Sequence, residues 1–428
     1  MKKFTDTIKE FVQVFDGSKG YMLQQEGLSG GESAEAWNIT KRDTLTALYQ
    51  KYKNAGSDVI QTNTFQGTEH HLKQHGFSGK VYEVNYTAAI AAKKVMGQEG
   101  YVAASVGPIG RMMTPSGDLT FDQAYQLYKE QMIPLIEGGV DAVNFETFTD
   151  VAELRAAVLA LKDLKKDMPV IASVAFEENK RTLMGTSPYN VALILKSLGC
   201  EVIGTNCSFG PEHMLDIIKE MSCVGGPLSV KPNAGIPRLE QNHAVYDQSP
   251  ADFARACEDF LPYGAVLIGG CCGTTPLFVS ELKSRLNDVK PVIREYRETG
   301  EISSLNFVVK INEYDTCNRV VLDMDDPNTR RIINNEDLLD LMTLAMDAKD
   351  LEPDVIVLQG GADLDPGKVC RCFDIIQGYS NKPFVFHVNK KDILEPLLRI
   401  YRGRGGVLTD NQHDLIEVAG KYGAFVIE

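Results

Sequence analysis

The sequence lacks several features that would place it in other protein classes. No run of 18 or more apolar residues occurs, so no segment has the pattern of a transmembrane helix. Lys2 and Lys3 are not followed by an apolar stretch, which is unlike a secretory signal peptide. Positive charge is in deficit, since 44 Lys and Arg stand against 58 Asp and Glu, a net charge of −14. We therefore expect a cytoplasmic protein with no membrane association and no nucleic-acid partner.

The overall amino-acid composition is that of an ordinary globular protein. Hydrophobic residues make up 43% of the chain and charged residues 24%, which excludes disordered and fibrous classes. The length of 428 residues predicts two or three domains, or one large barrel with an appendage. The nine cysteines are an odd number, and without an export signal they indicate a reducing compartment. There, cysteines serve metals or chemistry more often than disulfides.

Short apolar β runs alternate with helical stretches over residues 1–290, for example the helical periodicity of Phe121–Gly138 and Asp150–Leu164. Repeated strand–helix units predict parallel strands with crossover helices. Eight units predict an α/β fold of the (β/α)8 TIM-barrel type, with an active site at the carboxyl ends of the strands. An open doubly wound sheet is the alternative, although no Gly-x-Gly-x-x-Gly follows the first strand. The eight runs are Val12–Phe15, Asp58–Gln61, Val102–Ser105, Ala142–Glu146, Val170–Phe176, Val202–Asn206, Leu228–Pro232 and Val266–Gly270.

The pattern changes at residues 291–304, whose Pro, Gly, Ser and charged residues predict a linker. Residues 305–428 then return to α/β alternation, with about four strand–helix units that would form a half-barrel. A half-barrel leaves its sheet edges open. We expect these edges to be covered by the first domain or by a second chain, and so a homo-oligomer assembled through the half-barrel. The predicted elements are a helix at Leu338–Lys349 and strands at Val355–Leu358, Phe384–Val388, Gly406–Leu408 and Ala424–Ile427.

Three cysteines follow β runs that would end at one rim of the barrel. Cys207 ends Val-Ile-Gly-Thr-Asn-Cys, and Cys271 and Cys272 end Val-Leu-Ile-Gly-Gly-Cys-Cys. The glycines beside the pair let the backbone bend so that both thiols can reach one ion. Three thiolates suit a soft or borderline metal, zinc above all, and leave a fourth position open, as catalytic sites do. The alternative is three buried thiols that serve as small apolar side chains.

The charge of such a site predicts its chemistry. Zinc held by three thiolates carries a net negative charge, so it is a weak Lewis acid for activating water. It is better suited to binding an incoming thiol and lowering the thiol pKa, so that the thiolate stays nucleophilic near neutral pH. The predicted reaction is alkyl transfer to sulfur, with no catalytic residue beyond the zinc-bound thiolate.

A series of short motifs runs along residues 10–290. In order they are Val-Phe-Asp-Gly-Ser-Lys-Gly-Tyr-Met-Leu-Gln (14–24), Ala-Gly-Ser-Asp-Val-Ile-Gln-Thr-Asn-Thr-Phe (55–65), Ser-Val-Gly-Pro (105–108), Glu-Gly-Gly-Val-Asp (137–141), Glu-Thr (146–147), Gly-Thr-Asn-Cys-Ser-Phe-Gly-Pro-Glu (204–212), Lys-Pro-Asn-Ala-Gly-Ile-Pro (231–237) and Gly-Gly-Cys-Cys-Gly-Thr-Thr-Pro (269–276). Their order and spacing resemble the homocysteine S-methyltransferase family, which includes the homocysteine-binding module of cobalamin-dependent methionine synthase. The resemblance implies a zinc-binding barrel with Cys207, Cys271 and Cys272 as ligands. It also implies methyl transfer to the thiol of homocysteine, giving methionine.

The resemblance also implies which residues bind the substrate. Asp16 and Glu146 are similar to the acids that hold the amino group of homocysteine. Gly17 and Ser18 would offer backbone N–H groups to the substrate carboxylate. Asn233 would approach the zinc when no thiol is bound.

Some of these residues have structural alternatives, and one position departs from the family. Asp16 could be a turn carboxylate, and Glu146 a strand-end cap. Gln61 stands where the family more often has Glu, which removes a charge near the barrel rim.

Residues 305–428 resemble the first half of the pterin-binding barrel that follows this module in methionine synthases, both in the spacing of their strand–helix units and in their position after the first domain. That barrel opens with a motif near Glu-Arg-Thr-Asn, which is absent here. The strand ends read Leu-Gln-Gly-Gly (358–361) and His-Val-Asn (387–389), and no cobalamin-binding Asp-x-His-x-x-Gly occurs. We therefore expect a truncated, degenerate pterin-like domain, and a methyl donor that is a methylated corrinoid protein supplied as a partner.

Two alternatives stay open. The same thiol methyltransferase could use S-methylmethionine or betaine as its donor. The chain could instead be a non-catalytic subunit whose zinc site is structural or holds a thiol for a partner.

Overall fold

The structure is a computed structural model, and it describes every residue except 1, 236–237, 241–242, 312–315, 411 and 428. Its internal packing divides the chain into two compact units. The first unit contains Met1–Arg111, Asp122–Leu183 and Cys200–Tyr296, and the second contains Met112–Phe121, Met184–Gly199 and Arg297–Glu428. The last change from one unit to the other, after Tyr296, falls within the predicted linker.

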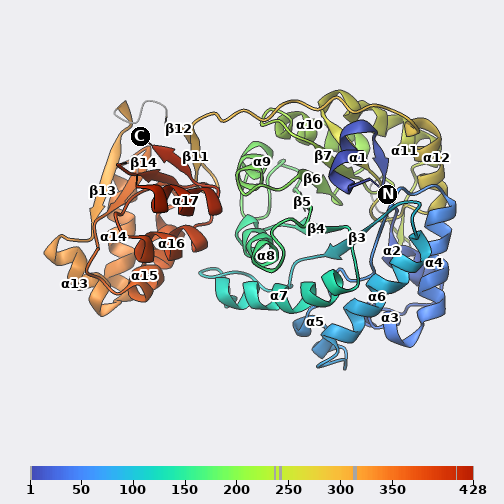
Figure 1. Cartoon of the computed structure of the whole chain (residues 1–428), viewed down its shortest axis with the longest axis horizontal. Coiled ribbons are helices and arrows are strands. Elements are labelled where there is room, and N and C mark those ends of the chain that lie inside the picture. The colour runs from blue at the N-terminus through green and yellow to red at the C-terminus, as the bar shows by residue number, and fades with distance from the viewer. Residues whose placement is uncertain (1, 236–237, 241–242, 312–315, 411, 428) are drawn as a thin grey trace. The chain divides into compact units, whose positions relative to one another are not determined.

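Eight parallel strands form one sheet in the order β1-β10-β7-β6-β5-β4-β3-β2 (Figure 1). A parallel bridge between Phe15 and Val59 joins β1 to β2, so the two ends of this order meet. Each barrel strand therefore lies beside the barrel strands that precede and follow it, which confirms the predicted TIM-type barrel and excludes the doubly wound sheet. The strands are β1 (Gln13–Val14), β2 (Val59–Gln61), β3 (Tyr101–Val106), β4 (Ala142–Phe148), β5 (Val170–Val174), β6 (Val202–Asn206), β7 (Leu228–Lys231) and β10 (Ala265–Ile268).

The barrel helices begin at residues that favour a helix start. The side chain of Asp150 accepts a hydrogen bond from the Ala152 amide at the start of α8, and Ser187 and Ser249 cap α9 and α11, each followed by proline. The helices are α1 (Phe4–Glu10), α2 (Lys19–Gln25), α3 (Trp37–Thr40), α4 (Arg42–Asn54), α5 (Glu69–Gln74), α6 (Val81–Met96), α7 (Phe121–Glu137), α8 (Val151–Leu164), α9 (Pro188–Ser197), α10 (Pro211–Met221), α11 (Pro250–Cys257), the 3-10 helix η1 (Glu258–Tyr263) and α12 (Pro276–Leu286). A hairpin of β8 (Arg238–Glu240) and β9 (His243–Val245) follows β7.

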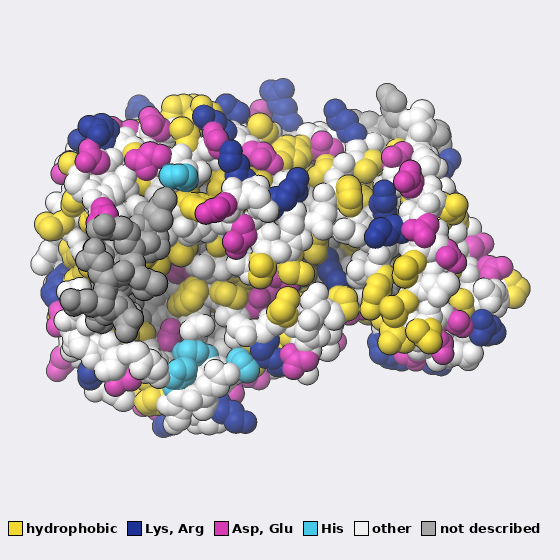
Figure 2. All heavy atoms as spheres, turned by 180° about the vertical axis from the view of Figure 1, so that it is seen from behind, with side chains coloured by type: hydrophobic (Ala, Val, Ile, Leu, Met, Phe, Trp, Pro, Cys, Tyr) yellow, Lys and Arg dark blue, Asp and Glu magenta, His cyan; other side chains and the backbone are white. Residues whose placement is uncertain are grey.

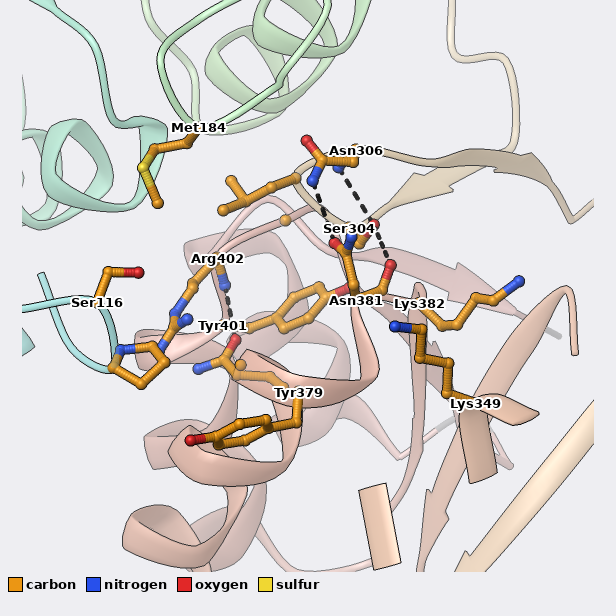
Figure 3. Close-up of a pocket in the computed structure, with 15 residues that line it drawn as sticks. Ser116, Met184, Ser304, Asn306, Lys349, Tyr379, Asn381, Lys382, Tyr401 and Arg402 are labelled. Carbon is orange, nitrogen blue, oxygen red and sulfur yellow. Dashed lines mark hydrogen bonds between the residues drawn. The ribbon is translucent and has the colours of Figure 1, made fainter. Parts of the chain in front are cut away.

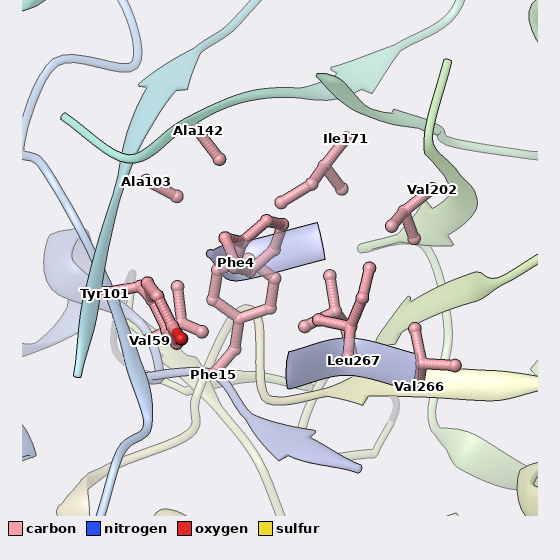
Figure 4. Close-up of a cluster of buried hydrophobic side chains, with 11 residues drawn as sticks. Phe4, Phe15, Val59, Tyr101, Ala103, Ala142, Ile171, Val202, Val266 and Leu267 are labelled. Atoms are coloured by element: carbon pink, nitrogen blue, oxygen red, sulfur yellow. The ribbon is translucent and has the colours of Figure 1, made fainter. Parts of the chain in front are cut away.

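A cluster of buried apolar side chains closes the amino end of the barrel (Figure 4). Phe4 and Ile8 of α1 pack against residues at or near the starts of the strands, and the Phe4 ring meets the edge of Tyr101 at 5.4 Å between centroids. Burying a side chain of this size contributes roughly 2–3 kcal/mol. Because α1 fills this end, the carboxyl end of the barrel is the one left for a site. The strand residues of the cluster are Phe15, Val59, Tyr101, Ala103, Ala142, Ile171, Val202, Val266 and Leu267.

The second unit contains a five-stranded parallel sheet in the sequential order β13-β14-β15-β16-β17. Four of its strands were predicted, whereas β13, whose short apolar run Val320–Leu322 lies between Arg319 and Asp323, was missed. Its core joins strand residues such as Val357 and Val385 to Ile302 of an antiparallel hairpin. The elements are β11 (Glu301–Ser303), β12 (Val308–Lys310), β13 (Arg319–Asp323), α13 (Pro327–Asn335), α14 (Leu338–Asp350), β14 (Val355–Gln359), α15 (Pro366–Ser380), β15 (Phe384–His387), α16 (Lys391–Ile400), β16 (Gly406–Leu408), α17 (His413–Lys421) and β17 (Phe425–Ile427).

Charged side chains of both signs are interspersed over the face shown in Figure 2. The described residues of that face therefore form no continuous basic surface of the kind that tracks a nucleic-acid backbone. Within the described residues, every helix is too short or too polar to cross a membrane.

Candidate functional site

A cavity of about 390 Å³ lies at the carboxyl end of the barrel. Its walls come from residues at or just beyond the ends of several strands, as parallel barrels arrange their sites. It contains the three predicted metal ligands, together with Gly17, Ser18 and Glu146. The remaining lining residues are Lys19, Gly20, Glu32, Ala34, Glu35, Gln61, Thr62, Asn63, Thr64, Phe65, Gln66, His71, Ser105, Thr147, Lys231 and Gly270.

Cys207 reaches this cavity because the chain turns sharply where β6 ends. Cys207 and Ser208 both have left-handed backbone conformations, with φ of 63° and 64°. Such conformations cost non-glycine residues about 1 kcal/mol or more each, and they recur at functional sites. The turn is held by hydrogen bonds from the Cys207 amide to the Lys231 carbonyl (3.0 Å) and from the Phe209 amide to the Cys207 carbonyl (2.7 Å).

Cys271 and Cys272 are positioned by backbone contacts beyond β10. The Cys271 amide donates to the Pro232 carbonyl at 2.7 Å, and the Cys272 amide donates to Oδ1 of Asn233 at 3.1 Å. Gly270 has to be glycine, because a Cβ there would lie 2.2 Å from the Thr274 hydroxyl oxygen. Asn233 therefore lies beside the cysteines, and its side chain orients the backbone of one of them.

The three cysteine Sγ atoms all lie within 4.8 Å of one another, and those of Cys207 and Cys272 are 3.9 Å apart. Hydrogen bonds from Cys271 and Cys272 lower the pKa of the Cys207 thiol to about 3. The same hydrogen bond with Cys207 raises the pKa of Cys271 to about 11, and the pKa of Cys272 is also raised. Without a cation, one thiolate is thus stabilised at the expense of the other two thiols. A soft divalent metal would let all three ionise, so this donor set fits zinc.

Glu146 is directed into the cavity by an irregularity in β4. The register of β4 with β5 shifts between Phe145 and Phe148, and Thr147 has a φ of 62°. A bulge of this kind re-aims a side chain at the end of a strand. The side chain of Asn206 fixes it, accepting from the Thr147 amide and donating to its hydroxyl, both at 2.7 Å.

Glu146 belongs to a buried polar network with Gln61, Ser105 and Lys231. One carboxylate oxygen accepts from Gln61 Nε2 at 2.6 Å and from the Ser105 hydroxyl, and the other forms an ion pair with Lys231. The Lys231 ammonium also donates to Gln61 Oε1. Burial alone lowers the pKa of Lys231, but the charges of Glu146, Cys271 and Asp16 outweigh it, so this pKa is raised. Lys231 therefore stays charged within the site.

Asp16 is fully buried, and its Oδ2 accepts from the Gln61 amide and from Lys19 Nζ, both at 2.8 Å. Burial raises the pKa of Asp16, and the two lysines of the site oppose that shift. The Ser18 amide donates to the carbonyl oxygen and to the hydroxyl oxygen of Thr274, both at 3.2 Å. The sequence predicted that the backbone amides of Gly17 and Ser18 bind the substrate carboxylate. Of these two amides, only that of Gly17 has no hydrogen-bond partner among the described residues.

Sequence reasoning missed Lys231, Lys19 and Tyr246. The two lysines stand inside motifs that were noticed, but nothing in the sequence shows that they contact Glu146 and Asp16. Tyr246 lies beside the cysteines, and burial together with Cys272 raises its pKa. No sequence signal marks it, because it follows the β8–β9 hairpin that the β-run pattern did not include.

The second unit has a cavity of about 270 Å³ (Figure 3). Its lining includes Lys349, Lys382 and Arg402, and none of its lining residues is an acid, a histidine or a cysteine. Ser304 donates to the Asn381 carbonyl within it at 3.1 Å. Residues just before β15 and β16 contribute to the lining, so the cavity lies at the amino ends of these strands. Ligands of open parallel sheets generally bind beyond the carboxyl ends of the strands, whereas this cavity lies at the amino ends.

Comparison with known proteins agrees with the geometry of the first unit. Residues 13–286 match the homocysteine S-methyltransferase family. The methionine synthase of Mycobacterium tuberculosis is 31% identical over 318 residues, covering 70% of this chain and 27% of that protein. The methionine synthase of Mycobacterium leprae is 31% identical over 306 residues, covering 66% and 25%. The chain thus spans about a quarter of the length of these relatives.

Among solved structures, the metallated form of the homocysteine methyltransferase MmuM from Escherichia coli is similar, with a TM-score of 0.57 at 20% identity. The match covers 66% of this chain and 99% of that one. The oxidised form of the same protein gives a TM-score of 0.55 at 21% identity, covering 64% and 96%. At these identities the likeness shows a shared barrel fold.

Proposed function

The chain belongs to the homocysteine S-methyltransferase family, and we propose that it transfers a methyl group to the thiol of homocysteine, giving methionine, with zinc held by its three clustered cysteines. The observation that carries this proposal is the convergence of three cysteine Sγ atoms within 4.8 Å at the cavity. When bound there, zinc would take up the substrate thiol as a thiolate and lower its pKa.

The residues of the chain would orient the substrate and hold the site together. The Gly17 amide would bind the substrate carboxylate, while Asp16 and Glu146 would hold its amino end. Fixing both ends of the substrate points its sulfur toward the donor, which reduces the entropic barrier to transfer. Asn233 and Asn206 would keep the ligand-bearing loops in place, since Asn233 binds the Cys272 amide and Asn206 approaches Cys271 Sγ at 3.8 Å.

We propose a methylated corrinoid protein as the methyl donor. The second unit supports an external donor, because its cavity lies at the amino ends of the strands and has no acid to hold a pterin ring. S-methylmethionine and betaine are the competing donors. A non-catalytic zinc subunit is a weaker alternative, because the cysteines line a cavity large enough for a substrate.

The test uses the zinc-loaded chain with homocysteine and methylcobalamin, following the cobalt spectrum and methionine together. Demethylation that requires homocysteine and all three cysteines is the expected result. Zinc that gains no sulfur ligand when homocysteine is added, as measured by X-ray absorption, would contradict the proposal. A thiol-induced change at zinc without turnover would instead favour a sulfonium or betaine donor, or a strict requirement for a protein-bound corrinoid.

We also propose self-association through the second unit in a reducing compartment. Leu338, Leu339 and Met346 of α14 are large apolar side chains with 53%, 72% and 49% exposure. No disulfide joins any of the nine cysteines, all of which lie among the described residues. Leu339→Glu is expected to lower the mass measured by analytical ultracentrifugation, and a monomeric full-length chain at micromolar concentration would contradict this.

A further inference from the structure

The cavity of the second unit (Figure 3) is built from segments that lie far apart in the sequence. All of its lining residues belong to that unit, including Ser116 and Met184. One wall is fixed by the buried Tyr401, whose hydroxyl donates to the Ser303 carbonyl at 2.8 Å and accepts from the Phe384 amide at 3.1 Å. The cavity is therefore formed before any ligand arrives, as small-molecule sites usually are.

The charges of this cavity are unbalanced. Its cationic lining residues are Lys349, Lys382 and Arg402, and its lining contains no acid. Arg402 is compensated, because its Nη2 donates to Oδ1 of Asp374 at 2.7 Å. Lys349 and Lys382 form no ion pair with any described residue, and the Lys382 ammonium lies 5.3 Å from the centre of the Phe307 ring. Two lysine charges therefore remain without a counter-charge at one cavity.

Several hydrogen-bond donors of the cavity are also unused. Nε and Nη1 of Arg402 and the hydroxyls of Ser116 and Tyr379 have no hydrogen-bond partner among the described residues. In Figure 3, Lys349 and Lys382 lie on one side of the pocket and Arg402 lies on the other. A ligand in the cavity would thus meet two ammonium groups at one end and a guanidinium with hydroxyl groups at the other.

We propose that this cavity binds a small phosphomonoester, with its phosphate paired with Lys349 and Lys382 and its polar remainder directed toward Arg402. A phosphomonoester carries about −1.5 to −2 charges at pH 7, which matches the two uncompensated lysines. The ligand is small, since about 270 Å³ is less than the roughly 300–1,000 Å³ of pockets for drug-sized ligands. The guanidinium and the free hydroxyls would donate to oxygen atoms of the remainder.

Calorimetric titration of the full chain with glycerol 3-phosphate tests the proposal. We expect saturable binding of one equivalent, whereas glycerol, which lacks the phosphate, should not bind. Lys349→Met and Lys382→Met should each raise the dissociation constant about 10-fold, the effect of one charge-assisted hydrogen bond. Lys349 is exposed and Lys382 half-buried, so both variants should keep the circular dichroism spectrum of the wild type.

A matched variant and a second anion sharpen the test. Lys421→Met also removes one positive charge from the second unit, but Lys421 is 47% exposed, pairs with Glu395 and does not line the cavity. This variant should bind glycerol 3-phosphate as tightly as the wild type does. Succinate should bind more weakly than glycerol 3-phosphate, because its two charges lie on separate carboxylates and cannot both pair with the lysines at one end.

The outcomes that would overturn the proposal are specific. Absence of saturable binding would overturn it, and so would a dissociation constant that the three lysine variants raise equally. Succinate that binds more tightly than glycerol 3-phosphate would overturn the assignment of a phosphate ligand. The proposed methyl transfer does not depend on these outcomes, because its cysteines and substrate-binding residues belong to the first unit.

Discussion

The two parallel sheets of this protein differ in what they place at the carboxyl ends of their strands. In the barrel, Cys207 and Thr147 adopt left-handed conformations and line one cavity, and Ser208 beside Cys207 is left-handed as well. In the five-stranded sheet, the left-handed residues that follow β14 are Gly360 and Gly361, which adopt this conformation without strain. Strained positions at the carboxyl ends of strands thus mark the sheet that carries the site, whereas left-handed residues such as Glu352 in the second unit lie elsewhere.

Both sheets repeat a strand–helix unit, but only the first sheet closes into a barrel. This closure explains why only its strand ends meet at one cavity. Strand ends in a closed barrel face one another across its mouth, so ligands from β6 and β10 can share one ion. Five strands of an open sheet, spaced by about 4.8 Å, distribute their ends along an edge of roughly 19 Å. The sequential order of β13 to β17 therefore gives an open sheet whose strand ends do not face one another across a mouth.

The largest effect expected is from breaking the cysteine cluster. Cys271→Ser should reduce bound zinc from one equivalent to nearly none, and methyl transfer by more than about 100-fold, since it removes a metal ligand. Metal analysis and the methyl-transfer assay measure both. Cys223→Ser is the control, because this thiol of the same unit is exposed and outside the cluster, and it should change neither. Full activity of a metal-free Cys271→Ser protein would refute the proposed mechanism.

Buried and half-exposed ion pairs of the two units should differ in the stability they supply. Glu146→Gln leaves Lys231 charged and buried, and it should lower the free energy of unfolding by about 3 kcal/mol. In the second unit, Glu298 pairs with the buried Arg404 but is itself 47% exposed, so Glu298→Gln should cost less than about 1 kcal/mol. Urea unfolding measures both, and equal losses would show that burial does not set the difference.

The stability contributed by one glutamate of each unit, Glu153 and Glu395, should depend on pH in opposite directions. Burial raises the pKa of Glu153 from 4.5 to about 7, so the folded protein binds the Glu153 proton more tightly than the unfolded chain does. The stability that this residue contributes is therefore fully present below pH 4.5 and is lost as the pH rises through 7. Relative to Glu153→Gln, wild type should lose up to about 3 kcal/mol between pH 4.5 and 8. Urea unfolding at both pH values checks this, and a pH-independent difference would contradict it.

Glu395 of the second unit is the counterpart to Glu153. Its hydrogen bond from Lys421 lowers its pKa, so its contribution is present above the unfolded value and lost as the pH falls below about 4.5. Because the pair is largely exposed, Glu395→Gln should change stability by under about 1 kcal/mol, with the opposite pH dependence.

The smallest effect expected is from relieving backbone strain. Ser208→Gly should stabilise the first unit by about 1 kcal/mol, because glycine adopts the left-handed conformation freely. Glu352→Gly, at an exposed left-handed residue of the second unit, should give a similar gain. Thermal unfolding measures both variants. Only Ser208→Gly is expected to weaken zinc binding, because it loosens the turn that carries Cys207.

Local patterns in the sequence predicted most of the fold. All eight barrel strands were predicted because parallel strands are buried on both faces and form continuous apolar runs. β13, whose apolar run Val320–Leu322 is short, and the β8–β9 hairpin were missed. The packing of α1 against the amino end of the barrel was not predicted either, since one short helix does not indicate which surface it covers.

The sequence by itself determined the barrel and the convergence of Cys207, Cys271 and Cys272 at one rim of it. Both were predictable because strand periodicity and a paired cysteine motif are local signals. Only the tertiary structure decided how the pocket is charged. Lys231 meets Glu146 across 85 positions and Gln61 across 170. Such contacts depend on barrel closure, which brings distant strand ends together, and no local pattern encodes them.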